Sequence, residues 1–232
     1  MPGLDYKMIL NAMVRLVIFD LDGTLLNTIA DLAAAANYAL SKQGLHGHSV
    51  GEYTKMVGHG VRNMLAAALE KTLGKEPCAV QVDKALEDFT PYYVEHIDVH
   101  TEPYPGMVEL LNKLVRKGIG VAVASNKFQG GTERLIGEFF PQVDFVAVFG
   151  NKPGLPLKPC ADVVNMILKK AGVERGECLY VGDSATDVKT AQNAGVVCAG
   201  VTWGFRPESD LREAGADYIV KSATELAALI GV

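Results

Sequence analysis

The sequence predicts an α/β protein with a doubly wound, mostly parallel sheet and a helical segment inserted after the first strand. Short apolar runs recur along the 232 residues, and such runs fit strands buried on both faces of a parallel sheet. Helical apolar patterns separate the runs, as in a fold that alternates strand and helix. The expected strands cover residues 14–19, 119–124, 145–149, 179–181, 196–201 and 218–220.

One stretch breaks this alternation. Residues 27–100 contain no strand pattern but three helical ones, at 29–42, 61–69 and 82–93. We therefore expect a core domain of residues 1–26 and 101–232, and a helical cap domain of residues 27–100. An insert that leaves and rejoins a sheet at one edge can hinge as a lid. The alternative is a helical layer packed rigidly on the core.

Composition and charge narrow the class of protein. The hydrophobic share of 49% excludes a disordered chain, and the net charge of −5 argues against a nucleic-acid partner. The N-terminus lacks a signal-peptide pattern and the apolar runs are too short to span a membrane, so we expect a cytoplasmic protein. The four cysteines form no CxxC pair, which favours buried, reduced thiols over a metal or disulfide site.

The strongest chemical signal is the motif Asp20-Leu21-Asp22-Gly23-Thr24, directly after the first strand. Ligands of open α/β sheets bind beyond the carboxyl ends of the strands. In an extended segment Asp20 and Asp22 would point to the same side, where their carboxylates repel unless a cation joins them. Magnesium prefers such oxygen ligands. Gly23 allows a tight turn. The alternative is an ordinary acidic surface turn.

Three further segments follow later strands. Gly182-Asp183-Ser184-Ala185-Thr186-Asp187 puts Asp183 where it can reach the same ion, whereas Asp187 can also be a helix-start carboxylate that complements the dipole. Ser125 and Asn126 end the strand 119–124, where a hydroxyl and backbone N–H groups can hold phosphate oxygens. Lys158 precedes a proline and would supply positive charge among these carboxylates.

Together these groups suit phosphoryl transfer. One carboxylate can attack phosphorus and form an aspartyl-phosphate. A metal ion and a lysine can neutralise the phosphoryl oxygens. A second carboxylate can give a proton to the leaving oxygen and later take one from water.

These four motifs, in this order, resemble the haloacid dehalogenase superfamily and, within it, the phosphoglycolate phosphatase group. The resemblance covers residues 14 to about 201. It implies that Asp20 is the nucleophile and Asp22 the general acid and base. It also implies that Asp20, the backbone carbonyl of Asp22, and Asp183 hold Mg²⁺, with Asp187 in support. The phosphoryl-binding residues would be Ser125, Asn126 and Lys158, together with Gly23 and Thr24 of the turn.

Within the superfamily, the residues favour a simple phosphatase. Carbon–halogen cleavage does not need the carboxylate at Asp22, and phosphonate-cleaving relatives usually carry Ala there. Sugar phosphomutases carry His twelve residues after the nucleophile, where this chain has Leu32. A sugar phosphomutase or another superfamily reaction stays as the alternative. So does a non-catalytic phosphate-binding or signalling module, although receiver domains are shorter and carry their acceptor Asp after the third strand.

The expected partner is a small phosphorylated metabolite, with 2-phosphoglycolate as the first guess. The stretch from Gly58 to Arg62 resembles the cap loop that contacts substrate in related phosphatases, and Arg62 can pair bidentately with a substrate carboxylate. An exposed arginine at a helix start is the equal alternative. The sequence does not decide between a monomer and a homodimer.

Overall fold

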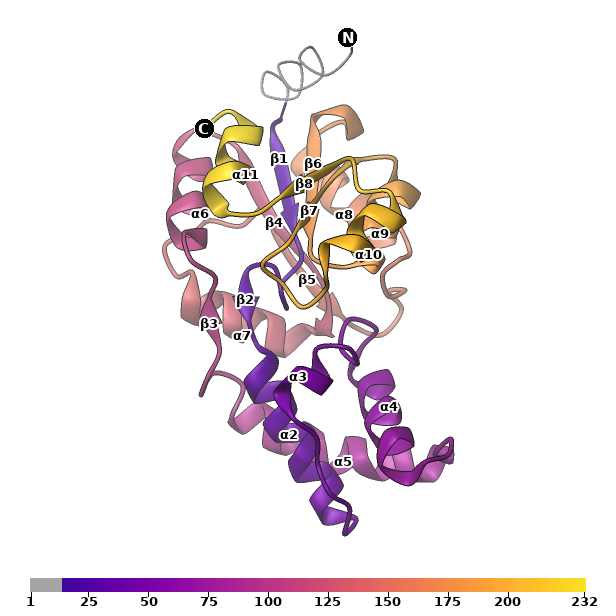
Figure 1. Cartoon of the computed structure of the whole chain (residues 1–232). Helices are drawn as coiled ribbons and strands as arrows, with labels where there is room; N and C mark the ends of the chain where they lie inside the picture. Colours follow the sequence, from indigo (N-terminus) through magenta and orange to yellow (C-terminus); the bar gives the residue numbers. More distant parts are fainter. Residues whose placement is uncertain (1–13) are drawn as a thin grey trace. The chain divides into compact units, whose positions relative to one another are not determined.

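A six-stranded parallel sheet with the strand order β5-β4-β1-β6-β7-β8 forms the core of the larger of two units (Figure 1). The predicted α/β class is confirmed. In the computed structural model, which describes residues 14–232, the strands are β1 (Leu16–Phe19), β4 (Gly120–Phe128), β5 (Ala147–Asn151), β6 (Cys178–Gly182), β7 (Val197–Val201) and β8 (Tyr218–Val220). All four residues of β1 are buried, because this strand lies between β4 and β6 and is covered on both faces.

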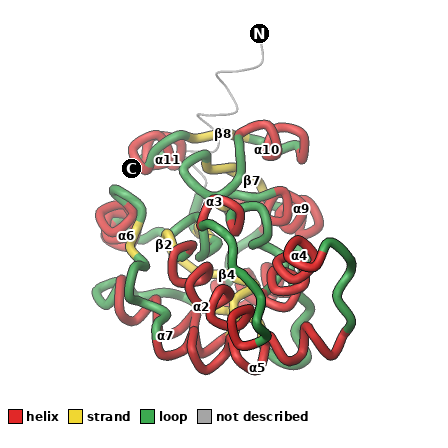
Figure 2. The backbone as a smooth tube through the Cα atoms, turned by 60° about the horizontal axis from the view of Figure 1, so that its bottom comes forward, coloured by secondary structure: helices red, strands yellow, loops and turns green. Residues whose placement is uncertain are grey.

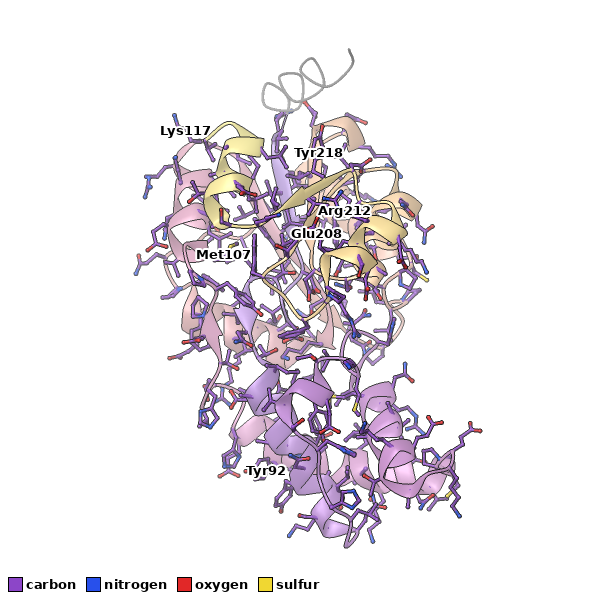
Figure 3. All side chains as sticks on the ribbon, viewed as in Figure 1. Tyr92, Met107, Lys117, Glu208, Arg212 and Tyr218 are labelled. Carbon is purple, nitrogen blue, oxygen red and sulfur yellow. The ribbon has the colours of Figure 1, made fainter. Side chains whose placement is uncertain are left out.

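Helices cover both faces of the sheet. They are α6 (Met107–Arg116), α7 (Gln129–Phe139), α8 (Asp162–Ala171), α9 (Ala185–Ala194), α10 (Glu208–Ala214) and α11 (Ala223–Ile230), with a short 3-10 helix η1 (Arg175–Glu177) before β6. One apolar core joins β1, β4 and β6 to α8, α9 and α10. Helices α6 and α11 lie on the other side of the sheet in Figure 1. In α6, Met107 is buried, whereas Lys117 at its end lies on the outer surface (Figure 3).

The second unit, Leu26–Glu102, is helical; the first comprises the residues up to Leu25 and from Pro103 onward. Its helices, red in Figure 2, are α2 (Ile29–Lys42), α3 (Val50–Tyr53), α4 (Val61–Leu73) and α5 (Ala79–Glu95). A two-residue strand at its start, β2 (Leu26–Asn27), pairs with β3 (Glu102–Pro103), a ribbon that the sequence did not indicate. The insert predicted at residues 27–100 falls in this unit. Its role as a lid stays a prediction.

A buried carboxylate ties the two ends of the helical unit together. Asp31, in the first turn of α2, is 2% exposed. Its oxygens accept hydrogen bonds from the backbone N–H of His100 at 3.0 Å, and from the N–H and hydroxyl of Thr101 at 2.8 Å each. Charge-assisted bonds of this kind are stronger than neutral ones. They fix the segment before β3 against the start of α2.

Two expectations about side chains and membranes can be compared with the structure. Cys178 and Cys198 are buried, but Cys78 and Cys160 are exposed, so the expectation of four buried thiols is wrong for two of them. Cys78 precedes the first turn of α5 and Cys160 lies in a loop, where no sheet covers them. Across residues 14–232, no helix combines the length and apolar character that crossing a bilayer requires.

Candidate active site

Asp20 lies just beyond the buried end of β1, and its neighbours fix it there. Its backbone N–H donates to the carbonyl of Val181 in β6 at 2.9 Å, which extends the pairing of the two strands by one residue. The carboxylate oxygen Oδ1 lies 2.8 Å from Lys158 Nζ and accepts a bond from the N–H of Leu21 at 2.7 Å. The residue is 8% exposed. The predicted nucleophile is therefore held rigidly at the carboxyl edge of the sheet.

Three buried carboxylates gather at this edge. Asp20, Asp183 and Asp187 offer oxygens that all lie within 4.8 Å of one another. Burial, and then the charge of Asp187, raises the pKa of Asp183 to about 7. The same two causes raise the pKa of Asp20 well above its ordinary range. Carboxylates so close together in a poorly solvated place resist ionising unless positive charge is near them.

Lys158 supplies positive charge to this group. Its Nζ is 2.8 Å from an oxygen of Asp20 and 2.8 Å from Oδ1 of Asp187, and its side chain is 3% exposed. Burial alone would lower the pKa of this lysine, but the Asp187 and Asp20 carboxylates together raise it well above its usual value. The lysine therefore stays charged. When all three carboxyl groups are ionised, they and one ammonium leave two negative charges, which matches a divalent cation.

Asn126 positions Lys158 through the backbone. Its Oδ1 accepts a bond from the N–H of Lys158 at 2.8 Å, and its Nδ2 donates to the carbonyl of Lys158 at 3.2 Å. Both polar ends of this amide are therefore used to fix the lysine. Phosphate binding by the Asn126 backbone stays a prediction.

Asp187 is both the helix-start carboxylate and a member of the acidic group, so the two alternatives for this residue hold together. It is fully buried in the first turn of α9. Its Oδ2 accepts bonds from the hydroxyl of Ser184 at 2.6 Å and the N–H of Ser184 at 3.1 Å. The hydroxyl of Tyr180 donates to Oδ1 at 3.3 Å. This capping arrangement fixes the carboxylate that faces Lys158.

Asp22 is placed differently from the expectation. A cation shared by the Asp20 and Asp22 side chains is not what the structure supports, because the Asp22 carboxylate contacts Lys127 Nζ at 2.8 and 3.1 Å. The reason is local. The chain bends at Leu21, whose carbonyl accepts the N–H groups of Thr24 and Leu25, so the two-residue period of a strand does not apply. The Asp22 carbonyl as a metal ligand stays a prediction.

The loop after β7 lies against the site. The indole N–H of Trp203 donates to the carbonyl of Thr24 at 3.0 Å, and the N–H of Phe205 donates to Oδ2 of Asp183 at 2.7 Å. Between them, a Cβ on Gly204 would lie 2.3 Å from Cβ of Asp183 and 2.4 Å from the carbonyl oxygen of Gly23. Only glycine at this position lets the loop lie so close to Asp183 and Gly23. The position of the loop after β7, at the same edge of the sheet, was the available signal.

The turn residues are also close to Asp183. Gly23 has a φ of 88°, and a Cβ there would lie 2.5 Å from Oδ2 of Asp183. Thr24 is fully buried, and its Oγ1 has no hydrogen-bond partner among residues 14–232. Ser125 is 7% exposed and its Oγ accepts the N–H of Lys127 at 3.1 Å. Phosphate binding by these three residues stays a prediction.

Arg62 belongs to the helical unit. It is the second residue of α4, and its guanidinium pairs with Asp83 at 2.6 Å while both side chains are about half exposed. Exposed pairs of this kind contribute little to stability. Contact between Arg62 and a substrate stays a prediction.

Comparison with known proteins identifies the class. The profile of the haloacid dehalogenase-like hydrolase family matches residues 17–201, and the chain belongs to this family. It is 32% identical over 217 residues to phosphoglycolate phosphatase 1 of Pseudomonas aeruginosa, covering 91% of this chain and 78% of the relative. It is 34% identical over 192 residues to the phosphoglycolate phosphatase of Agrobacterium fabrum, covering 82% and 81%.

A solved structure agrees with this assignment. The crystal structure of a protein from Lactobacillus delbrueckii subsp. bulgaricus, provisionally named a phosphoglycolate phosphatase, superposes with a TM-score of 0.89 at 35% identity. The match covers 94% of this chain and 98% of that one. The predicted superfamily and group resemblance is confirmed, and the chain is an enzyme of the hydrolase class.

Proposed function

We propose that this protein is a Mg²⁺-dependent phosphatase that hydrolyses a small phosphomonoester through an aspartyl-phosphate on Asp20. The observation that carries the proposal is the contact of Lys158 with Asp20 inside a group of three buried carboxylates. The group lies at the edge of the sheet where α/β proteins bind ligands. The names of the relatives support phosphate esters as substrates and make 2-phosphoglycolate the first candidate.

The donor set fits magnesium. Asp20 and Asp183 would hold the ion, with Asp187 beside them, because hard cations prefer carboxylate oxygens. When all three carboxyl groups are ionised and Lys158 is paired, the two negative charges that remain match a divalent cation. When bound, Mg²⁺ would supply positive charge opposite the phosphoryl oxygens.

The first half-reaction uses both aspartates of the first motif. A carboxylate oxygen of Asp20 attacks phosphorus, and the bond between phosphorus and the ester oxygen breaks. The leaving oxygen takes a proton from the carboxyl group of Asp22 and departs as an alcohol. Lys158 and the hydroxyl of Ser125 are the candidates to hold the phosphoryl oxygens during this transfer.

The second half-reaction restores the enzyme. Asp22, now a carboxylate, takes a proton from water as the water oxygen attacks phosphorus. The bond between phosphorus and the Asp20 oxygen breaks, which releases inorganic phosphate and regenerates the Asp20 carboxylate. Asp22 ends protonated, as it began.

The carboxylate of 2-phosphoglycolate needs a positively charged partner, and we propose Arg62 for this role. Arg62 pairs with the exposed Asp83, and breaking such an exposed ion pair costs little free energy. Replacing Arg62 by Met should raise KM for 2-phosphoglycolate and leave KM for an ester without a carboxylate unchanged. Equal effects on both esters would remove Arg62 from the proposal.

A phosphate-release screen over phosphorylated metabolites, with and without Mg²⁺, tests the function. We expect release of inorganic phosphate from small esters only when Mg²⁺ is present, and its loss in Asp20→Asn. Asp144→Asn, a change on an exposed loop residue, is the matched control and should keep full activity. Full activity of Asp20→Asn would refute the nucleophile, and an isomeric phosphate ester as product would indicate a phosphomutase.

A further inference from the structure

A second buried lysine contacts the proposed acid and base, and no motif considered in the sequence accounts for it. Lys127 Nζ lies 2.8 and 3.1 Å from the two oxygens of Asp22. The lysine side chain is 3% exposed and the Asp22 side chain 22%. We propose that Lys127 is a positioning residue, which holds the Asp22 carboxylate ready to take a proton from water in the second half-reaction. This inference rests on the proposed function.

The backbone of Lys127 is fixed on several sides. Lys127 is the second-to-last residue of β4, in the stretch where the pairing with β5 shifts register between Ala124 and Phe128. The carbonyl of Lys127 accepts a bond from the hydroxyl of Thr132 at 3.3 Å, and a Cβ on Gly150 would lie only 2.5 Å from that carbonyl oxygen. The position of Lys127 is therefore set by the sheet and by close packing, independently of Asp22.

The two lysines of the site serve different carboxylates. Lys158 contacts Asp20 and Asp187, whereas Lys127 contacts Asp22. A buried ammonium is costly unless a carboxylate pairs with it, so each pair is strongly favoured once the sheet has placed the lysine. The bidentate contact restricts the orientation of the Asp22 carboxylate.

This role separates the two half-reactions kinetically. Formation of the phospho-enzyme depends on Asp20 as nucleophile and on the acid form of Asp22. Its decay depends on the carboxylate of Asp22, which Lys127 orients. Because kcat/KM reports only the steps up to departure of the alcohol, a change confined to the decay lowers kcat and KM together and leaves kcat/KM unchanged.

The test is rapid-quench kinetics on the full chain with the best ester from the phosphate-release screen. In Lys127→Met we expect decay of the phospho-enzyme to slow at least about tenfold, with its formation unchanged within about twofold. The phospho-enzyme should accumulate, and KM should fall with kcat. Lys127→Arg, which keeps the charge, should recover part of the decay rate. Lys117→Met, on the outer surface, is the matched control and should behave as wild type.

A double variant tests whether Lys127 acts through Asp22. This variant is tested with an aryl phosphate whose leaving group departs without a proton, because Asp22→Asn removes the acid of the first half-reaction. In the Asp22→Asn background, Lys127→Met should slow decay no further. The double variant leaves no carboxylate without its lysine, so the test still works if the single variant folds poorly. An equal loss in formation and decay, or a fall in kcat/KM, would overturn the inference and indicate a phosphate-binding lysine. An unchanged decay rate would overturn it too. Absence of any phospho-enzyme in wild type would instead refute the proposed function.

Discussion

Gly204→Ala is the change that the structure predicts most sharply. An added Cβ would lie 2.3 Å from Cβ of Asp183, while ordinary carbon contacts begin near 3.4 Å, so the loop or the carboxylate must move by about 1 Å. The bond from the N–H of Phe205 to Oδ2 of Asp183 is 2.7 Å long, and such a movement takes it beyond hydrogen-bonding range. Asp183 then loses the donor that orients it.

The expected result is weaker metal binding with the fold retained. Loss of an outer hydrogen bond to a metal ligand typically costs about 10- to 100-fold in affinity, and we expect the Kd for Mg²⁺ to rise by that factor. Isothermal titration of the metal-free chain without substrate measures it. Trp203→Phe, which removes only the indole bond to the Thr24 carbonyl, should give a smaller rise.

Gly137→Ala is the matched control, because this exposed glycine of α7 has nothing within 4 Å of an added Cβ. It should bind Mg²⁺ as wild type does. If Gly204→Ala retains the wild-type circular dichroism spectrum and also the wild-type Kd, the loop does not orient Asp183 and the reasoning is refuted.

Two further predictions concern protonation and the helical unit. Since burial and Asp187 raise the pKa of Asp183 from 3.8 to about 7, the metal-free folded chain holds a proton that the unfolded chain releases. The stability from this proton is present below about pH 4 and is lost as pH rises through about 7. The unfolding free energy measured in urea should therefore fall over this pH range, and Asp183→Asn should reduce the fall. An equal fall in the variant would contradict this prediction. Asp31→Ala leaves the buried N–H groups of His100 and Thr101 without their acceptor, and should lower the unfolding free energy by about 2–3 kcal/mol in denaturation followed by circular dichroism. An unchanged midpoint would mean that water replaces the carboxylate.

Most of the fold could be predicted because a buried strand is recognisable from a continuous run of apolar residues. The run at residues 16–19 is apolar throughout and its strand is buried throughout. The motifs lie at or near the carboxyl ends of β1, β4 and β6, which are neighbours in the sheet, so this edge brings Asp20, Ser125 and Asp183 to one region. The two-residue strands β2 and β3 could not be predicted, because they carry no apolar period.

The parts of the site that sequence reasoning missed depend on contacts between distant segments. Lys127 is separated from Asp22 by 105 residues, and a lysine after Ser-Asn resembles a solvated turn residue until the sheet buries it. Gly204 is one of 24 glycines, and only its distance to Asp183 distinguishes it. The Asn126 amide reaches the backbone of Lys158, 32 residues further along the chain, and this contact could not be predicted from local sequence.

Trapping of the covalent intermediate tests the nucleophile most directly. Wild-type protein is mixed with Mg²⁺ and its best ester, quenched in acid during turnover, treated with borohydride and digested for mass spectrometry. Borohydride reduces an acyl phosphate to an alcohol, so the peptide that contains Asp20 should carry homoserine at that position, and the peptides that contain Asp183 or Asp187 should be unmodified. Reduction at another carboxylate, or none during rapid phosphate release, would contradict covalent catalysis by Asp20.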